Sequence, residues 1–306
     1  MIQQFDSLMQ MMEVFSDEQV CIDRLRSIRW KNGAFCPHCG GTKIYNFSDG
    51  KTHKCGDCRQ RFSIKVGTIF EDSKIPLRKW FMAVWLITSH KKGIASTQLA
   101  KDLQITQKSA WFVLHRLRYA AQSPSFNAPL AGEVEVEVDE TYVGGKGKNM
   151  HKDKKDKIGR GTSGKTAVVG AVERGGNVIA TVVPNSQGDT LREFVRQNVS
   201  SGAKLLATDE AHAYKELAAE YNHGVVRHGA KQYVDGRVHT NTIEGYWSLL
   251  KRQIIGIHHW ISPKHLNRYV AESAWRHNRR GSKEGNRVNQ LLEAVSGRLT
   301  YKALIA

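Results

Sequence analysis

The stretch from residue 133 to residue 145 reads EVEVEVDETYVGG and decides how the second half of the chain folds. In it, Val134, Val136 and Val138 alternate with acidic residues. Because successive side chains of a strand point to opposite faces, this period of two predicts a β-strand. The strand is expected to end at Asp139, with its glutamates on an exposed face.

Beyond this strand, strand-like and helix-like patterns alternate. A tight turn at residues 174–176 is expected to join two further strands as a hairpin. The patterns predict strands at 166–172, 178–183 and 204–208 and from residue 225, and helices at 189–199, 211–221, 242–255 and 263–278. A Gly- and Lys-rich loop is expected at 146–165. Three strands followed by alternating strands and helices predict an α/β fold, with a mixed sheet flanked by helices.

Three carboxylates fall at the predicted ends of these elements. Asp139 ends the first strand, Asp209 ends the fourth, and Glu244 lies in the first turn of a helix. Strand ends and helix starts can converge at one edge of a sheet, and converging carboxylates repel one another unless a cation lies between them. Carboxylate oxygens suit Mg²⁺ or Mn²⁺, and two such ions can promote an in-line phosphoryl displacement. The pattern therefore predicts these three acids to be catalytic residues and metal ligands.

Each acid also has a structural explanation. Asp209 could cap the following helix, Glu244 could oppose a helix dipole, and Asp139 could be one more polar residue on an exposed strand face. There are rival ligands: Glu140, Glu210 and Asp235, with Asn241 the rival to Glu244 as third ligand. Lys251 lies two turns after Glu244 on the same predicted helix face, so it and the adjacent Arg252 are candidate phosphate or DNA contacts.

Four of the five cysteines form two Cys-x2-Cys pairs. Cys36 and Cys39 are separated by fifteen residues from Cys55 and Cys58. This spacing is typical of a structural zinc site in which four thiolates surround the ion and leave no open position. His38 and His53 are spare candidates whose simpler interpretation is exposed loop residues, and Cys21 is expected to be a buried hydrophobe.

The segments around the cysteines look helical. Residues 4–31 and 77–88 have helical patterns, and residues 97–103 and 107–118 have the size of a helix-turn-helix. On the second of these helices Lys108, Arg116 and Arg118 occupy polar positions and are candidate DNA contacts, because such a helix can enter the major groove. An ordinary helical hairpin on a basic surface remains the alternative.

Charge points to a polyanionic partner. The 306 residues include 46 Lys and Arg against 29 Asp and Glu, a net charge of +17, which favours nucleic acid. The sequence lacks both a run of 18 apolar residues and a secretory signal at its start, so we expect no membrane contact and a cytoplasmic location.

Three segments together resemble the DDE transposases of bacterial insertion sequences. They are VDETYVGG at 138–145, TDE at 208–210 and HTNTIEGYWSLLKR at 239–252. With its cysteine pattern, the chain is more narrowly similar to the group related to the eukaryotic Merlin transposases, in which a zinc ribbon precedes a ribonuclease-H-like catalytic domain. The resemblance implies a triad at Asp139, Asp209 and Glu244, with Lys251 as the basic residue beyond it. Because members of this group can carry Asn as the third residue, Asn241 stays open.

The resemblance also implies a domain order. We expect an N-terminal helical segment (1–32), a zinc ribbon (33–72), a helical DNA-binding region with the helix-turn-helix (73–122), a ribonuclease-H-like catalytic domain (131–282) and a C-terminal tail (283–306).

The implied function is metal-dependent DNA cleavage and strand transfer at the ends of an insertion sequence. The expected partners are the terminal inverted repeats, the target DNA and further copies of the chain, as a homodimer or larger assembly on DNA, in a bacterial nucleoid. Two alternatives remain. A transcription regulator would share the ribbon, the helix-turn-helix and the charge, and a ribonuclease-H-like nuclease without strand transfer would keep the triad.

Overall fold

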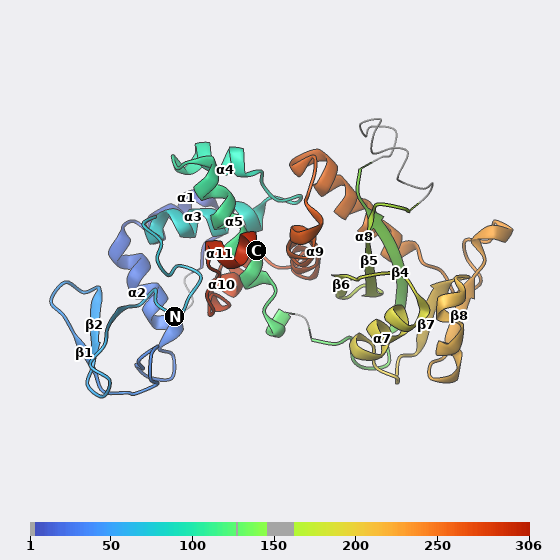
Figure 1. Ribbon diagram of the computed structural model, residues 1–306, viewed down its shortest axis with the longest axis horizontal. Coiled ribbons are helices and arrows are strands. Elements are labelled where there is room, and N and C mark those ends of the chain that lie inside the picture. The colour runs from blue at the N-terminus through green and yellow to red at the C-terminus, as the bar shows by residue number, and fades with distance from the viewer. Residues whose placement is uncertain (1–3, 127, 146–161) are drawn as a thin grey trace. The chain divides into compact units, whose positions relative to one another are not determined.

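A five-stranded sheet forms the centre of residues 124–280, the second of two units into which the chain divides in this computed structural model (Figure 1). The structure describes residues 4–126, 128–145 and 162–306, so most of the Gly- and Lys-rich loop predicted at 146–165 lies outside the described residues. The strands are β4 (Glu135–Val143), β5 (Thr166–Glu173), β6 (Val178–Val182), β7 (Leu205–Asp209) and β8 (His223–Val226).

The sheet order is β6-β5-β4-β7-β8. The first three strands in sequence pair antiparallel, while β7 and β8 add parallel strands on the other side of β4. This mixed sheet, flanked by helices, is the ribonuclease-H-like arrangement that the sequence patterns and the resemblance predicted.

Helices cover both faces of the sheet. They are α7 (Gly188–Asn198), the 3₁₀-helix η3 (His212–Ala219), α8 (Asn241–Gln253) continued by the π-helix η5 (Ile254–His258), and α9 (Pro263–Asn278), with short 3₁₀ turns η1 (Pro124–Phe126) and η4 (His228–Ala230). Because successive side chains of each strand point to opposite faces, the sheet has a separate hydrophobic core on each face. Val169 packs with α7 and η3 on one face, whereas Val168 packs with α8 and α9 on the other. Each face of the sheet therefore buries its own apolar layer.

Unit 1 comprises residues 1–123 and 281–306. Its elements are α1 (Leu8–Val14), α2 (Glu18–Arg29), a small antiparallel sheet of β1 (Ile44–Asn46), β2 (Thr52–Cys55) and β3 (Arg61–Ser63), then α3 (Leu77–Ser89), α4 (Ser96–Leu103), α5 (Gln107–Ala121), α10 (Glu284–Glu293) and α11 (Tyr301–Ile305). The rings of Phe15 and Phe81 meet edge to face in its helical core. No helix in the described part of the chain is long and apolar enough to cross a membrane.

The C-terminal residues correct one prediction. Residues 283–306, expected to be a tail, form α10 and α11, and α10 packs against α2, α3 and α5. Val288, Leu291 and Leu292 are almost fully buried there. Their spacing places them on one face of a helix, so burial of that apolar stripe explains why the segment folds into unit 1.

Candidate active site

The register of the central sheet brings Asp139 next to Asp209. Strand β4 pairs in parallel with β7, Glu135 opposite Leu205 and Glu137 opposite Ala207, an offset of 70 positions. Two residues further along, the same offset aligns Asp139 with Asp209. The prediction that β4 itself ends at Asp139 is wrong, because β4 runs on to Val143 by pairing with β5. What ends here is β7, so the two acids lie where the parallel part of the sheet stops.

Helix α8 brings the third acid to the same place. Asp139, Asp209, Glu244 and Lys251 all line one cavity of about 360 Å³. The indole N–H of Trp247, also on α8, donates to Asp139 Oδ2 at 3.0 Å and ties the helix to β4. The lining of this cavity does not include Asn241 or Arg252, and Arg252 donates instead to the Ser248 carbonyl of its own helix. The geometry therefore favours Glu244 over Asn241 as the third ligand.

Several carboxylates share this cavity with Lys251 and His228, and His228 Nε2 lies 3.6 Å from Glu244 Oε1. Burial, together with repulsion from the carboxylates of Glu140 and Asp209, raises the pKa of Asp139 to about 7. Asp209 accepts a hydrogen bond from the backbone N–H of Ala211 (3.0 Å), and Glu244 accepts one from the Thr240 hydroxyl (3.0 Å). Carboxylates gathered in one cavity are the kind of donor set that a hard cation stabilises.

The rival acids each have contacts of their own. Glu140 lies on the opposite face of β4, where its Oε2 accepts from the Tyr214 hydroxyl at 2.7 Å. Glu210 accepts the backbone N–H of Gly229 at 2.8 Å. The third, Asp235, lines a neighbouring cavity that shares Asp209. Glu140 also lines the triad cavity, and its bond to the Tyr214 hydroxyl is what distinguishes it from Asp139, Asp209 and Glu244.

The spacing of the triad bears on the number of cations. Within the described ranges, the cysteines of unit 1 form the one group of three or more His, Cys, Asp or Glu whose ligand atoms all lie within 4.8 Å of one another. The oxygens of Asp139, Asp209 and Glu244 do not all approach that closely. Two ions about 3.5–4 Å apart, each bound at about 2.1 Å, span a wider set of oxygens than one ion does. The three acids therefore do not form a compact single-ion cluster among the described residues.

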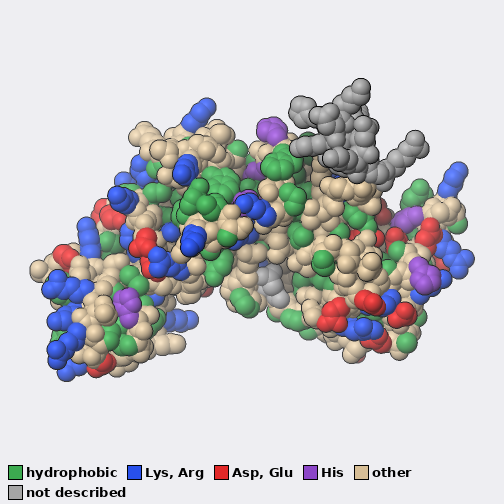
Figure 2. Space-filling model, viewed as in Figure 1, with side chains coloured by type: hydrophobic (Ala, Val, Ile, Leu, Met, Phe, Trp, Pro, Cys, Tyr) green, Lys and Arg blue, Asp and Glu red, His purple; other side chains and the backbone are tan. Residues whose placement is uncertain are grey.

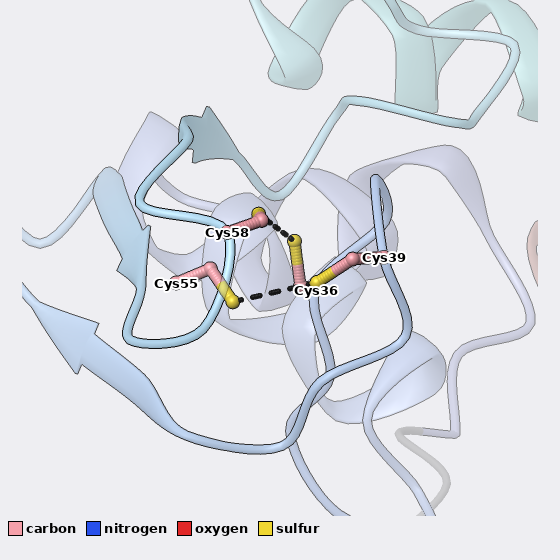
Figure 3. A group of neighbouring side chains, drawn as sticks. All are labelled: Cys36, Cys39, Cys55 and Cys58. Carbon is pink, nitrogen blue, oxygen red and sulfur yellow. Dashed lines mark hydrogen bonds between the residues drawn. The ribbon is translucent and has the colours of Figure 1, made fainter.

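The four paired cysteines converge (Figure 3). Cys36 Sγ lies 3.7 Å from Cys58 Sγ, and Cys39 Sγ lies 3.6 Å from Cys55 Sγ. Four thiolates at about 2.3 Å from a zinc ion would be about 3.8 Å apart in a tetrahedron. Backbone N–H groups of Cys58 and Asp57 lower the pKa of the Cys55 thiol to about 7, which favours the thiolate that binds zinc. These contacts match a structural zinc site.

The two cysteine turns share a backbone device. Gly40 follows the first pair at φ +78°, and Arg59 follows the second at φ +61°. Both residues have the left-handed backbone conformation, which glycine adopts readily and other residues seldom adopt. His53, the spare ligand candidate, is not an exposed loop residue. It is buried on β2, where its Nδ1 lies 2.9 Å from Asn46 Oδ1 and its ring packs against Trp30.

The structure corrects the predicted DNA contacts on α5. Only its first turn is open, and Lys108 there is exposed. Arg116 and Arg118 are buried, at 5% and 1% exposure. Arg116 donates to the carbonyl groups of Ile69 (2.7 Å), Glu71 (2.8 Å) and Leu299 (3.2 Å). Its guanidinium group therefore ties distant parts of unit 1 together and has no free face for a phosphate.

This correction predicts the effect of a substitution. Arg116→Met keeps most of the apolar stem but leaves buried carbonyl groups without their donor, so we expect unit 1 to lose about 3 kcal/mol of stability. Urea unfolding followed by tryptophan fluorescence measures this loss. Lys108→Met is the control, since it should leave the urea midpoint unchanged and weaken DNA binding in low salt. Equal midpoints for Arg116→Met and the unmodified chain would contradict the structural role.

Comparison with known proteins identifies two domains in the chain. Residues 129–278 match the family model of the ISXO2-like transposase domain, and residues 16–61 match that of the transposase zinc-ribbon domain. The chain belongs to the insertion-sequence transposases. One relative is an uncharacterized protein in transposable element ISH50 of Halobacterium salinarum, 28% identical over 264 residues that cover 82% of this chain and 85% of the relative.

The basic residues of the transposase include a group on the ribbon. Figure 2 shows Lys and Arg side chains gathered over the β1–β2 end of unit 1. Lys43, Lys51, Arg59 and Arg61 are exposed there. A zinc ribbon with exposed cations in a transposase indicates a DNA-binding module.

Sequence reasoning missed two residues that hold the transposase site together. Trp247 was quoted only as part of a motif, yet it contacts Asp139 directly. Its ring also packs on Gly170, where an added Cβ would lie 2.7 Å from the ring. Glu137 was taken for an exposed strand residue but is fully buried. The sequence contains one sign of the contact between Trp247 and Gly170. A glycine in the middle of a predicted strand often marks a place where another group approaches the backbone closely.

Proposed function

We propose that Asp139, Asp209 and Glu244 bind two Mg²⁺ or Mn²⁺ ions and that the chain cleaves and joins DNA strands at the ends of an insertion sequence. The observation that carries the proposal is the shared cavity, in which a half-buried Asp139 with a raised pKa faces the aligned Asp209 and the helix that bears Glu244 and Lys251. Acids gathered in this way, in a chain of net charge +17, suit a cation-dependent reaction on a polyanion.

The residues divide the work of phosphoryl transfer. Bound divalent ions would activate the attacking oxygen and stabilise the leaving oxygen. Asp139 and Asp209, fixed on neighbouring strands, hold one side of the site, and Glu244 closes it from α8. Lys251, two turns along the same helix, holds the scissile phosphate in line. A water first cuts the transposon end, and the 3′-hydroxyl so released then attacks the target DNA.

DNA approaches this site from the adjoining surface. A second cavity of about 580 Å³ shares Asp209 and is also lined by Lys215 and Arg227, whose charges suit the strand on one side of the scissile phosphate. The ribbon and the open first turn of α5 bind the terminal inverted repeats. Both ends must be processed together, so two or more copies of the chain assemble on DNA.

Asp209→Asn tests the proposal. Asn keeps an acceptor for the Ala211 N–H but removes the charge that binds a cation, so cleavage of end-containing DNA with Mg²⁺ should fall by about 10²–10³-fold or more. The control is Glu210→Gln, which alters the neighbouring acid that contacts Gly229 instead and should leave cleavage unchanged. Undiminished cutting by Asp209→Asn would end the proposal. A joining assay with precut ends separates a transposase from a nuclease that only cuts.

A further inference from the structure

Glu137 is a charged residue with no access to solvent. It precedes Asp139 by two positions on the same face of β4, and its exposed fraction is 0%. Arg174, the residue that follows β5, donates from Nε to Glu137 Oε1 at 2.7 Å, and His239 Nδ1 lies 3.0 Å from the same oxygen. Burying a carboxylate is costly unless it is paired and fully hydrogen-bonded, so this carboxylate needs partners of that quality.

The other partners of Glu137 are the first residues of α8. Its Oε2 accepts the backbone N–H groups of Thr242 (2.7 Å) and Ile243 (3.0 Å), and its Oε1 accepts the Thr242 hydroxyl (2.8 Å). The first N–H groups of a helix have no partner within the helix. The N-cap residue Thr240 supplies no side-chain cap, and its hydroxyl donates to Glu244 instead. A carboxylate from β4 thus replaces the missing cap and meets the positive end of the helix dipole.

We propose that Glu137 is a positioning residue for the metal-binding acids: it fixes the start of α8 on β4 and thereby sets where Glu244 lies relative to Asp139. The inference rests on the proposed function of the cavity. Glu244 follows Thr242 by two residues, so a shift of the helix start moves its carboxylate directly.

Two ties on the same strand face define how α8 lies against β4. Glu137 holds the first turn, and Asp139 accepts the Trp247 N–H one turn further along. Contacts one turn apart restrict both sliding and rotation of the helix. Arg174 makes the first tie rigid, because its Nη1 and Nη2 also donate to the carbonyl groups of Arg237 (2.7 Å) and His239 (3.0 Å) in the segment before α8. The bonds to Glu137 are charge-assisted, the stronger class of hydrogen bond.

The chain offers a matched control for Glu137 in Glu135. Glu135 lies on the same face of the same strand and pairs with Arg174, at 2.6 Å, and with Arg237, but among the described residues it accepts no N–H group of α8. In Glu137→Gln the amide NH₂ must face donors at one of the two oxygen positions, so the residue loses either its bond to Arg174 or its bonds to the N–H groups of α8, and it no longer joins the two. In Glu135→Gln the Glu137 cap remains intact.

Mn²⁺ binding to the full chain without DNA, measured by electron paramagnetic resonance, separates these variants. We expect Glu137→Gln to weaken Mn²⁺ binding about 10–100-fold, the usual effect of removing a group that orients ligands. The Mg²⁺ concentration for half-maximal cleavage should rise in parallel, and Glu135→Gln should change neither quantity. Equal weakening by both variants, or normal Mn²⁺ binding by Glu137→Gln, would overturn the inference.

Thr242→Val keeps the inference testable if Glu137→Gln does not fold. It removes one hydroxyl donor to Glu137 and keeps the shape of the side chain. We expect a several-fold weaker Mn²⁺ affinity with an unchanged urea midpoint, and unchanged affinity would contradict the positioning role. Failure of the proposed function would look different, because the unmodified chain would then bind no Mn²⁺ or cut DNA without it.

Discussion

Replacement of Asp139 by Asn is expected to abolish DNA cleavage and, at the same time, to stabilise the metal-free catalytic unit. The loss of cleavage follows from removing a metal-binding charge, and we expect about 10²–10³-fold or more. The gain in stability follows from the cost of burying that charge near Glu140 and Asp209. Asn can still accept the Trp247 N–H, so the link between β4 and α8 survives the substitution.

The pH dependence of this gain has a definite sign. The pKa of Asp139 is about 7 in the folded chain and 3.8 in its ordinary state, so between these values the folded chain holds a proton that the unfolded chain has released. Stability due to Asp139 therefore falls as pH rises from about 4 to 7 and stays low above that range. We expect the free energy of unfolding of Asp139→Asn to exceed that of the unmodified chain by about 1–3 kcal/mol at pH 8 and to equal it at pH 4.

Thermal unfolding with and without Mg²⁺ measures both effects. Mg²⁺ stabilises the chain that binds it, so the melting temperature of the unmodified chain should rise with Mg²⁺ at pH 8 and that of Asp139→Asn should not. Glu210→Gln serves as the control, because the Glu210 carboxylate accepts the Gly229 N–H and does not line the triad cavity, so this variant should keep the Mg²⁺ response. A variant that is less stable than the unmodified chain at pH 8, or that still cuts DNA, would contradict the assignment of Asp139.

Local patterns in the sequence identify Asp139 and Asp209 because each acid lies next to a short run of strand-forming residues. Their proximity depends on the register of β4 against β7, which a single sequence does not encode locally. Placing Glu244 beside them needs α8 to cross the same strand. Periodicity alone could not predict that the three acids lie together. That expectation came from the resemblance to a known family.

Glu137 shows where strand patterns fail. Glu135, Glu137 and Asp139 share one face of β4, and alternation with valine makes that face look exposed. It is covered because α8, more than a hundred residues later, packs on it and offers two backbone N–H groups. No local signal distinguishes a solvated glutamate from one that caps a distant helix.

The same device occurs in unit 1. The carboxylate of Glu18 on α2 accepts the N–H groups of Leu77 (2.8 Å) and Arg78 (3.0 Å) at the start of α3, a helix without a side-chain cap of its own. Glutamates that cap a distant helix are thus used in both units. The buried arginines of α5 were missed for a related reason, since the carbonyl groups that Arg116 contacts come from residues far away in the sequence.

Removal of zinc is expected to unfold the ribbon while the catalytic unit stays folded. The apolar cluster of the ribbon contains three fully buried residues, Cys36, Cys55 and Phe62, and two of these are metal ligands. So small a core cannot offset the conformational entropy of the loops, whereas structural zinc in small domains contributes about 10–16 kcal/mol. Cys55→Ser, or a chelator, should therefore lower bound zinc and expose residues 33–72 to proteases.

Cys21→Ala is the matched control for this zinc prediction. Cys21 is fully buried on α2, outside the four-cysteine cluster, and burial raises the pKa of its thiol to about 12. A thiol that stays protonated is a poor zinc ligand, so Cys21→Ala should keep one zinc per chain and a protected ribbon. Mn²⁺ binding in unit 2 should persist in Cys55→Ser, because Asp139 and Asp209 lie on a sheet with its own apolar layers. If the ribbon of Cys55→Ser resisted proteolysis as well as that of Cys21→Ala, its fold would not depend on the metal.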